Sequence, residues 1–308
     1  MTLQQLKYAV AIDRYHSFAQ AAEALNVTQP TLSGMIGKLE DELGVSLFER
    51  TSRKVTTTAT GHLIIEQARR TLREADRIKD IVNERKGAVS GTLQLAIGPS
   101  IAPYLIPQFI RLYLNDNPDV KLTVEEMRPD AIIKALLQAD IDAGIAATGI
   151  AVQGILEIPL YTERFFIYLS EQLRRANPAF HPRQLENQRL WVMKDVQCLR
   201  DSAFSFCKAR TGKHHVYEAG NIDTLIRIVD INGGYTIIPE MHLPLLPPTA
   251  TANVRAIDGD YLSLRKVSMY IREDYVRQQM LNSIADTLKK FIPPSMLDTR
   301  LKSRPIIL

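Results

Sequence analysis

The hydrophobic pattern changes its period once along the chain, and this change constrains the fold more than any other feature. Up to about Lys86, apolar residues recur every three or four positions, as in helices that bury one face. A stretch bounded by glycines, residues 87–91, follows. From Thr92 onward, short apolar runs alternate with helical patterns, which is typical of an α/β sheet with covered faces. The sequence therefore predicts a helical N-terminal part hinged to an α/β part.

Length and composition set further limits. The 308 residues are too many for one ordinary hydrophobic core, and 45% hydrophobic with 23% charged residues is typical of a soluble globular protein. No apolar run is long enough to span a membrane, and the N-terminus lacks the pattern of a signal peptide, so we expect a cytoplasmic protein. A net charge of +4 permits a polyanionic partner but does not demonstrate one.

Two short helices joined by a tight turn stand out in the first 58 residues. Ser17 is a plausible N-cap for a helix over Phe18–Leu25. After a three-residue turn, Thr28 caps a second helix that carries Pro30 in its first turn and ends at Gly44. This arrangement fits a helix-turn-helix, in which the second helix enters the major groove of double-stranded DNA.

The residues expected to contact DNA are short polar side chains at the start of the second helix and basic side chains beyond it. They are Thr28, Gln29, Pro30, Thr31, Ser33, Lys38, Arg50 and Arg53. Residues 51–58 are β-branched and basic and predict a small wing. Residues 1–58 hold six basic and six acidic side chains, so the charges are segregated, not in excess. On composition alone, an ordinary helical domain with a solvated charged face fits equally well.

From Ala59 to about Lys86 one long helix is predicted, with a single apolar stripe and a heavily charged remainder. Such a helix favours a partner helix and hence a dimer. Packing against its own domain is the alternative.

The N-terminal motifs resemble those of LysR-type transcriptional regulators. The Ala-Ala-x-x-Leu run, Thr-Gln-Pro-Thr-Leu-Ser, Leu-Glu-x-x-Leu-Gly, Leu-Phe-Glu-Arg and Thr60-Gly61 occur in the family's order and spacing. The resemblance implies a winged helix-turn-helix, a coiled-coil-like dimer, usually a homotetramer, and a two-lobed α/β regulatory domain like the periplasmic binding proteins. RNA polymerase is a further partner to consider. The expected domains are residues 1–58, 59–91 and 92–308, with lobe I at about 92–161 and 267–300 and lobe II at about 162–266.

The α/β pattern after residue 91 predicts individual elements. The expected helices are Tyr104–Asn115, Ala131–Gln138, Leu199–Ala209, Ile222–Asp230 and Tyr275–Phe291. The expected strands are Thr92–Gly98, Val120–Glu125, Ile141–Ala146, Ile155–Leu160, Phe165–Leu169, Leu190–Met193, Tyr235–Ile238 and Lys266–Ile271.

Two cysteines, Cys198 and Cys207, are the chain's only thiols. Cys198 lies at the N-terminal edge of the helix predicted over 199–209, close to Lys194 and Arg200, and the helix dipole and both cations favour its thiolate. The two cysteines are nine positions apart, which in a helix separates them by roughly 13 Å along the axis. A disulfide needs Cα atoms within about 7 Å. A disulfide would therefore require this helix to unwind. Two structural thiols are the alternative.

The segments around these cysteines and around Gly98-Pro99-Ser100 resemble the peroxide-sensing members of the LysR family. The resemblance implies that hydrogen peroxide oxidises Cys198, that Cys207 resolves it as a disulfide, and that oxidative-stress genes are activated. It also implies that the Ser100 hydroxyl holds peroxide and that Arg200 and Asp201 orient the thiolate. Two departures bear on reactivity: Gln197 replaces a histidine and Pro129 replaces a hydroxyl residue.

Three rival interpretations remain. A LysR-type regulator could instead bind a metabolite between its lobes, in a cleft lined by Ser100 and Arg128. The second rival is an enzyme such as a thiol peroxidase, in which the helix-turn-helix would have no purpose. The third is a plain substrate-binding protein, but such proteins lack an N-terminal DNA-binding domain. The six histidines are scattered, and no phosphate-cradling glycine loop occurs, so neither a metal nor a cofactor is expected, and the protein is not expected to be an enzyme.

Overall fold

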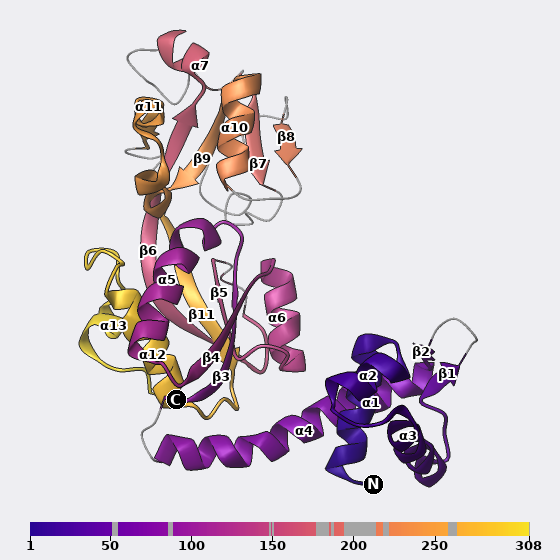
Figure 1. Ribbon diagram of the computed structural model, residues 1–308. Helices are drawn as coiled ribbons and strands as arrows, with labels where there is room; N and C mark the ends of the chain where they lie inside the picture. The colour runs from indigo at the N-terminus through magenta and orange to yellow at the C-terminus, as the bar shows by residue number, and fades with distance from the viewer. Residues whose placement is uncertain are drawn as a thin grey trace. The chain divides into compact units, whose positions relative to one another are not determined.

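The computed structural model describes residues 1–50, 55–85, 89–147, 149, 151–176, 185, 188–193, 214–217, 222–257 and 264–307. The chain forms two compact units, Met1–Lys86 and Gly87–Leu308 (Figure 1). None of the helices in these ranges is long and apolar enough to cross a membrane.

The N-terminal unit packs four helices and a two-stranded hairpin around one apolar core that includes Ile12, Leu32, Ile36 and Leu39. Its elements are α1 (Leu3–Tyr15), α2 (Phe18–Ala24), α3 (Gln29–Leu43), β1 (Phe48–Arg50), β2 (Val55–Thr57) and α4 (Ala59–Arg85). The hairpin β1–β2 is antiparallel and pairs Arg50 with Val55. The predicted helix-turn-helix is confirmed.

Local sequence fixes the helix ends in this unit. The Ser17 hydroxyl accepts a hydrogen bond from the Gln20 amide, and the Thr28 hydroxyl accepts one from the Thr31 amide, so both predicted N-caps are confirmed. Gly44 ends α3 with φ of 68°, a left-handed conformation that costs glycine little.

The long helix α4 has two environments. Near its start, Ile65 and Ala68 are buried in the core of the unit. Further on, Ile78 and Val82 are 66% and 48% exposed in the single chain. The predicted apolar stripe is therefore only partly covered by the described part of its own unit.

The second unit is built on a mixed sheet with strand order β4-β3-β5-β11-β6-β9-β7-β8, and β10 pairs with β6. The strands are β3 (Gly91–Ile97), β4 (Val120–Glu126), β5 (Ala143–Ala146), β6 (Ile155–Leu169), β7 (Leu190–Met193), β8 (His214–Tyr217), β9 (Tyr235–Pro239), β10 (Val254–Ala256) and β11 (Leu264–Arg272). Parallel pairs lie at both ends, and the central pairs β5–β11, β11–β6 and β6–β9 are antiparallel. The predicted α/β class is confirmed.

Helices cover both faces of the sheet (Figure 1). They are α5 (Ala102–Asp116), α6 (Pro129–Gln138), α7 (Glu171–Ala176), α10 (Ile222–Asn232), η2 (Glu240–Leu245), α11 (Pro248–Thr251), α12 (Gln278–Lys289) and α13 (Thr299–Ser303). Leu95 of β3 packs in one core with α5 and α12, whereas its neighbour Ala96 packs with α6 on the other face. We call this half lobe I, and the half with separate cores around β7, β9 and α10 lobe II.

Strand β6 differs from the sequence prediction of two strands. It is one strand whose first part pairs with β11 and whose last part, Phe165–Leu169, pairs with β9. It therefore passes from lobe I into lobe II without a break. The helix predicted over 199–209 lies outside the described residues.

Candidate DNA-binding and sensing sites

Helix α3 turns its apolar side inward and its predicted DNA-binding residues outward. Leu32, Ile36 and Leu39 are fully buried. The side chains that stand on or close to the surface are the predicted ones: Thr28, Gln29, Pro30, Thr31 and Lys38 exposed, with Ser33 half-buried. The N-terminal turn of α3 thus offers hydroxyl and amide groups of the kind that bond base edges.

The wing is anchored to the helices by polar contacts that the sequence analysis missed. The Thr57 hydroxyl in β2 donates to Asp13 Oδ1 at 2.6 Å, and Arg69 Nη2 in α4 donates to Asp13 Oδ2 at 3.1 Å. Glu40 of α3 accepts from the Leu47 amide at the entry to β1. Asp13 and Glu40 therefore hold the hairpin to α1 and α3, so part of the acidic charge of this unit is paired within it.

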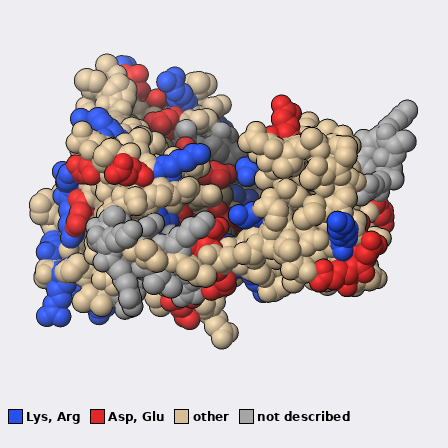
Figure 2. Space-filling model, turned by 60° about the horizontal axis from the view of Figure 1, so that its bottom comes forward, with Lys and Arg blue, Asp and Glu red and all other residues tan. Residues whose placement is uncertain are grey.

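Arg50 ends β1, but its side chain and all of Arg53 and Lys54 lie outside the described residues. Acidic and basic side chains are interspersed on the face drawn in Figure 2. The contribution of the wing to DNA binding stays a prediction.

The predicted sensing residues Cys198, Cys207, Arg200 and Asp201 lie outside the described residues, as does Gln197. The cysteines belong to the stretch of chain between β7 and β8, which pair in parallel. Trp191 in β7 donates its indole N–H to the Gly233 carbonyl at 2.9 Å.

Ser100 is the one predicted sensing residue that the structure describes. It lies in the turn between β3 and α5, and Arg265 binds both its hydroxyl and its carbonyl. Arg265 Nη1 donates to Ser100 Oγ at 2.9 Å, and Nη2 donates to the Ser100 carbonyl at 3.1 Å. The Ser100 hydroxyl is therefore fixed in direction, with its own proton free to be donated elsewhere.

Arg265 belongs to a buried polar cluster that the sequence analysis missed. Arg265 of β11 and Glu163 of β6 face each other in the strand register, and their side chains are only 1% and 0% exposed. Arg265 Nε donates to Glu163 Oε1 at 2.8 Å. A charged residue next to each predicted strand was the available signal, but nothing in the sequence paired the two.

Two tyrosines complete this cluster, which we call the Arg265 cluster: Ser100, Tyr104, Tyr161, Glu163 and Arg265. The Tyr104 hydroxyl donates to Glu163 Oε1 at 2.8 Å, lies 2.8 Å from the Tyr161 hydroxyl, and accepts from Arg265 Nη2 at 3.1 Å. Burial, followed by the charge of Glu163, raises the pKa of Tyr104 above its ordinary range, and burial likewise raises the pKa of Tyr161. Both phenols therefore stay protonated and keep their hydrogen bonds.

Pro129 and Arg128, two further residues named from the sequence, lie at the start of α6. Pro129 occupies the first turn of α6, and Arg128, half-exposed, pairs with Asp130 at 3.4 Å. No group of His, Cys, Asp and Glu that could hold a metal ion is found among the described residues.

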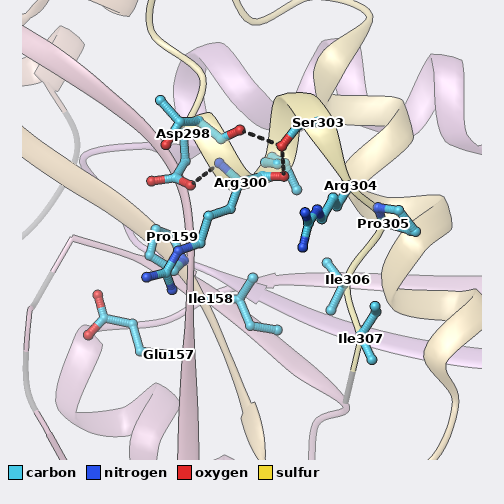
Figure 3. A pocket seen from close by; sticks show the side chains of 12 residues that line it. Glu157, Ile158, Pro159, Asp298, Arg300, Ser303, Arg304, Pro305, Ile306 and Ile307 are labelled. Atoms are coloured by element: carbon cyan, nitrogen blue, oxygen red, sulfur yellow. Dashed lines mark hydrogen bonds between the residues drawn. The ribbon is translucent and has the colours of Figure 1, made fainter.

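A separate cavity of about 540 Å³ lies where the C-terminal segment crosses the start of β6 (Figure 3). Its lining includes Glu157, Ile158, Arg300, Arg304 and Ile306, and none of the predicted site residues. Lys266 and the Ser268 hydroxyl both bind Glu157, at 2.7 Å each. This cavity is therefore distinct from the Arg265 cluster.

Two family models and many relatives match the chain. The bacterial regulatory helix-turn-helix model of the lysR family matches residues 3–62, and the LysR substrate binding domain matches residues 86–292. A hydrogen peroxide-inducible genes activator of Haemophilus influenzae is 35% identical over 243 residues, which are 78% of this chain and 81% of the relative. The dual regulator OxyR of Escherichia coli is 34% identical over 79% of this chain and 81% of its own.

The solved structure of a full-length OxyR variant from Pseudomonas aeruginosa is similar over 94% of this chain and 95% of its own, with a TM-score of 0.74 and 26% identity. The fold, a helix-turn-helix and a long helix followed by an α/β domain, agrees with both family models. The chain belongs to the LysR family of DNA-binding transcriptional regulators, a family of regulators and not of enzymes.

Proposed function

We propose that this LysR-type regulator senses hydrogen peroxide through a reversible Cys198–Cys207 disulfide and controls oxidative-stress genes. The observation that carries the proposal is the 35% identity, over nearly four fifths of the chain, to relatives named hydrogen peroxide-inducible genes activators. The presence of the two cysteines and the Arg265-bound Ser100 hydroxyl support it.

The chemistry needs only the two thiols and peroxide. The Cys198 thiolate attacks one peroxide oxygen, the O–O bond breaks, and hydroxide leaves, so that sulfur becomes a sulfenic acid. The Cys207 thiol then attacks that sulfur, the S–S bond forms, and water leaves. Arg200 and Asp201 orient the thiolate, and Ser100 donates its hydroxyl proton toward peroxide.

The disulfide acts as a switch because it changes the connection between β7 and β8, and the regulatory unit passes this change to DNA binding. We infer a homotetramer assembled through α4 and the regulatory units, acting in the cytoplasm on double-stranded DNA and contacting RNA polymerase as an activator. The exposed apolar side chains of α4 support the dimer. Thr28, Gln29, Pro30, Thr31 and Ser33 contact bases, and Lys38, Arg50 and Arg53 contact phosphates.

A second candidate is a regulator that binds a small molecule between the lobes. The match to the LysR substrate binding domain favours it. In that case Ser100 and its neighbours would bind the effector, and the cysteines would have no part in the response.

Thiol accounting distinguishes the two. Wild type, Cys198→Ser and Cys207→Ser are treated with micromolar peroxide, and free thiols and operator protection are measured on the same samples. Wild type should lose both thiols and change its footprint, Cys198→Ser should do neither, and Cys207→Ser should form a sulfenic acid without a disulfide. A normal footprint change in Cys198→Ser would exclude the redox mechanism and favour the effector.

The DNA contacts are tested by the salt dependence of binding. Arg53→Ala should weaken binding to all sequences and lower the slope of log K against log salt by about one. Lys121→Ala, an exposed charge change in β4 of the other unit, is the matched control and should leave the slope unchanged. An unchanged slope in Arg53→Ala would show that the wing does not contact phosphate.

A further inference from the structure

Glu163 lies at the centre of the Arg265 cluster and binds three different segments of the regulatory unit. Its Oε1 accepts from Arg265 Nε and from the Tyr104 hydroxyl, both at 2.8 Å, and its Oε2 accepts from the Met241 amide at 3.0 Å. These donors belong to β11, α5 and η2. The carboxylate therefore joins β6 to β11, α5 and η2.

Stability alone is a poor explanation for this arrangement. Removing two charges from water costs more than a buried pair commonly returns, and well-packed apolar residues would serve stability as well. What the charges supply instead is direction, because a guanidinium has a planar fork of donors that a carboxylate can hold in one orientation.

The orientation matters at the other end of Arg265. Its Nη1 and Nη2 bind the hydroxyl and the carbonyl of Ser100, so the guanidinium sets both the turn and the hydroxyl direction. Tyr104 braces the same Nη2 at 3.1 Å, and Tyr161 braces Tyr104 at 2.8 Å. The hydrogen bonds that run from Glu163 and Tyr104 through Arg265 therefore lead to Ser100.

We propose that Glu163, Tyr104 and Tyr161 are positioning residues of the peroxide site: they lock Arg265 so that it holds the Ser100 hydroxyl in the direction that receives peroxide. This inference rests on the proposed function. The three residues act through Arg265 and Ser100, and therefore affect the reaction with peroxide more than the intrinsic reactivity of the Cys198 thiolate.

The test compares two reagents that attack the same thiol. Oxidation by hydrogen peroxide and alkylation by iodoacetamide are measured at one pH in wild type, Glu163→Gln and Tyr104→Phe. Loss of one orienting hydrogen bond should slow the peroxide reaction about tenfold, with alkylation changed less than about twofold. Tyr104→Phe keeps the ring and its packing, so it remains informative if Glu163→Gln does not fold.

Glu157→Gln is the matched control. It lies on the same strand, and its carboxylate also pairs with a cation of β11, Lys266, at 2.7 Å, but it is outside the cluster. Both of its rates should equal those of wild type. A double variant adds a second readout: Ser100→Ala with Tyr104→Phe should be no slower than Ser100→Ala alone, because both changes remove the same fixed hydroxyl.

Wild-type peroxide rates in Glu163→Gln and Tyr104→Phe would overturn the inference. Equal slowing with both reagents would also overturn it, since the cluster would then act on the thiol or on the whole fold. If wild type and Glu157→Gln themselves fail to react with peroxide, the proposed function fails first, and this inference with it.

Discussion

The two units of this chain place polar residues in opposite ways. In the N-terminal unit the predicted functional side chains of Thr28 and of α3 lie at or near the surface of a core that is almost entirely apolar. In the regulatory unit the described part of the site is buried and charged, and Arg265 meets a serine 165 positions earlier in the chain. The proposed DNA-contacting residues can therefore change without affecting a core, whereas the described residues of the proposed sensing site also hold the fold together.

The largest effect on stability is expected when the buried pair of Arg265 and Glu163 is broken. Arg265→Leu leaves the Glu163 carboxylate buried without its cation and should lower the free energy of unfolding of the regulatory unit by about 3–5 kcal/mol. Chemical denaturation measures it. Lys266→Leu is the control, because its partner Glu157 is partly exposed and such pairs contribute below about 1 kcal/mol. Equal losses would mean that burial of the cluster is not what distinguishes it.

In the N-terminal unit the largest effect should come from a close approach of two backbones. A Cβ atom on Gly61 would lie 2.2 Å from the Leu47 carbonyl oxygen, so Gly61→Ala should destabilise this unit by about 1–3 kcal/mol. Nothing lies within 4 Å of a Cβ on Gly37 in α3, so Gly37→Ala should instead stabilise it by about 0.5–1 kcal/mol. Thermal unfolding of both variants tests the difference in sign.

A smaller effect is expected at the start of α3. Thr28→Ala removes the acceptor for the Thr31 amide and should lower stability by about 1 kcal/mol, whereas Thr28→Ser keeps the cap. Urea denaturation in the absence of DNA measures the contribution of the cap to stability alone. A loss of DNA affinity in Thr28→Ser at unchanged stability would assign the methyl group to recognition.

The smallest expected effect is a pH dependence in the regulatory unit. Burial lowers the pKa of His242 from its ordinary value of 6.5, against the opposing influence of Asp223, whose Oδ1 lies 3.3 Å from Nε2. The unfolded chain binds a proton at this imidazole more readily than the folded chain does. The contribution of neutral His242 to the free energy of unfolding is therefore complete above pH 6.5 and is lost as the pH drops toward the lower folded-state pKa. Unfolding at a series of pH values should show a flatter profile for His242→Gln, and no flattening for His62→Gln on the exposed surface of α4.

Sequence reasoning succeeded where structure is decided locally. The caps at Ser17 and Thr28 and the end at Gly44 depend on neighbours within a few positions, and each is found as expected. Sequence reasoning failed at β6 because residues 161–164, between the two predicted strands, include the polar side chains of Thr162, Glu163 and Arg164. These residues interrupt the apolar run, yet they pair with β11 and continue the strand.

In the candidate site, too, local sequence predicted some residues and could not predict others. Ser100 could be named from its local motif, but its partner Arg265 could not, because strand pairing between distant segments brings Arg265 to Glu163 across 102 positions. The roles of Cys198, Cys207, Arg200 and Asp201 stay predictions.

Trp191 has a practical consequence. It is the only tryptophan in 308 residues. Its indole is bonded to Gly233, its ring lies 5.8 Å from the Arg189 guanidinium carbon, and it stands seven positions before Cys198. Indole emission responds to nearby charge and solvent, so the intact protein carries one optical reporter beside the proposed switch. Its fluorescence during peroxide treatment would follow the change in real time, without any label on the thiols being counted.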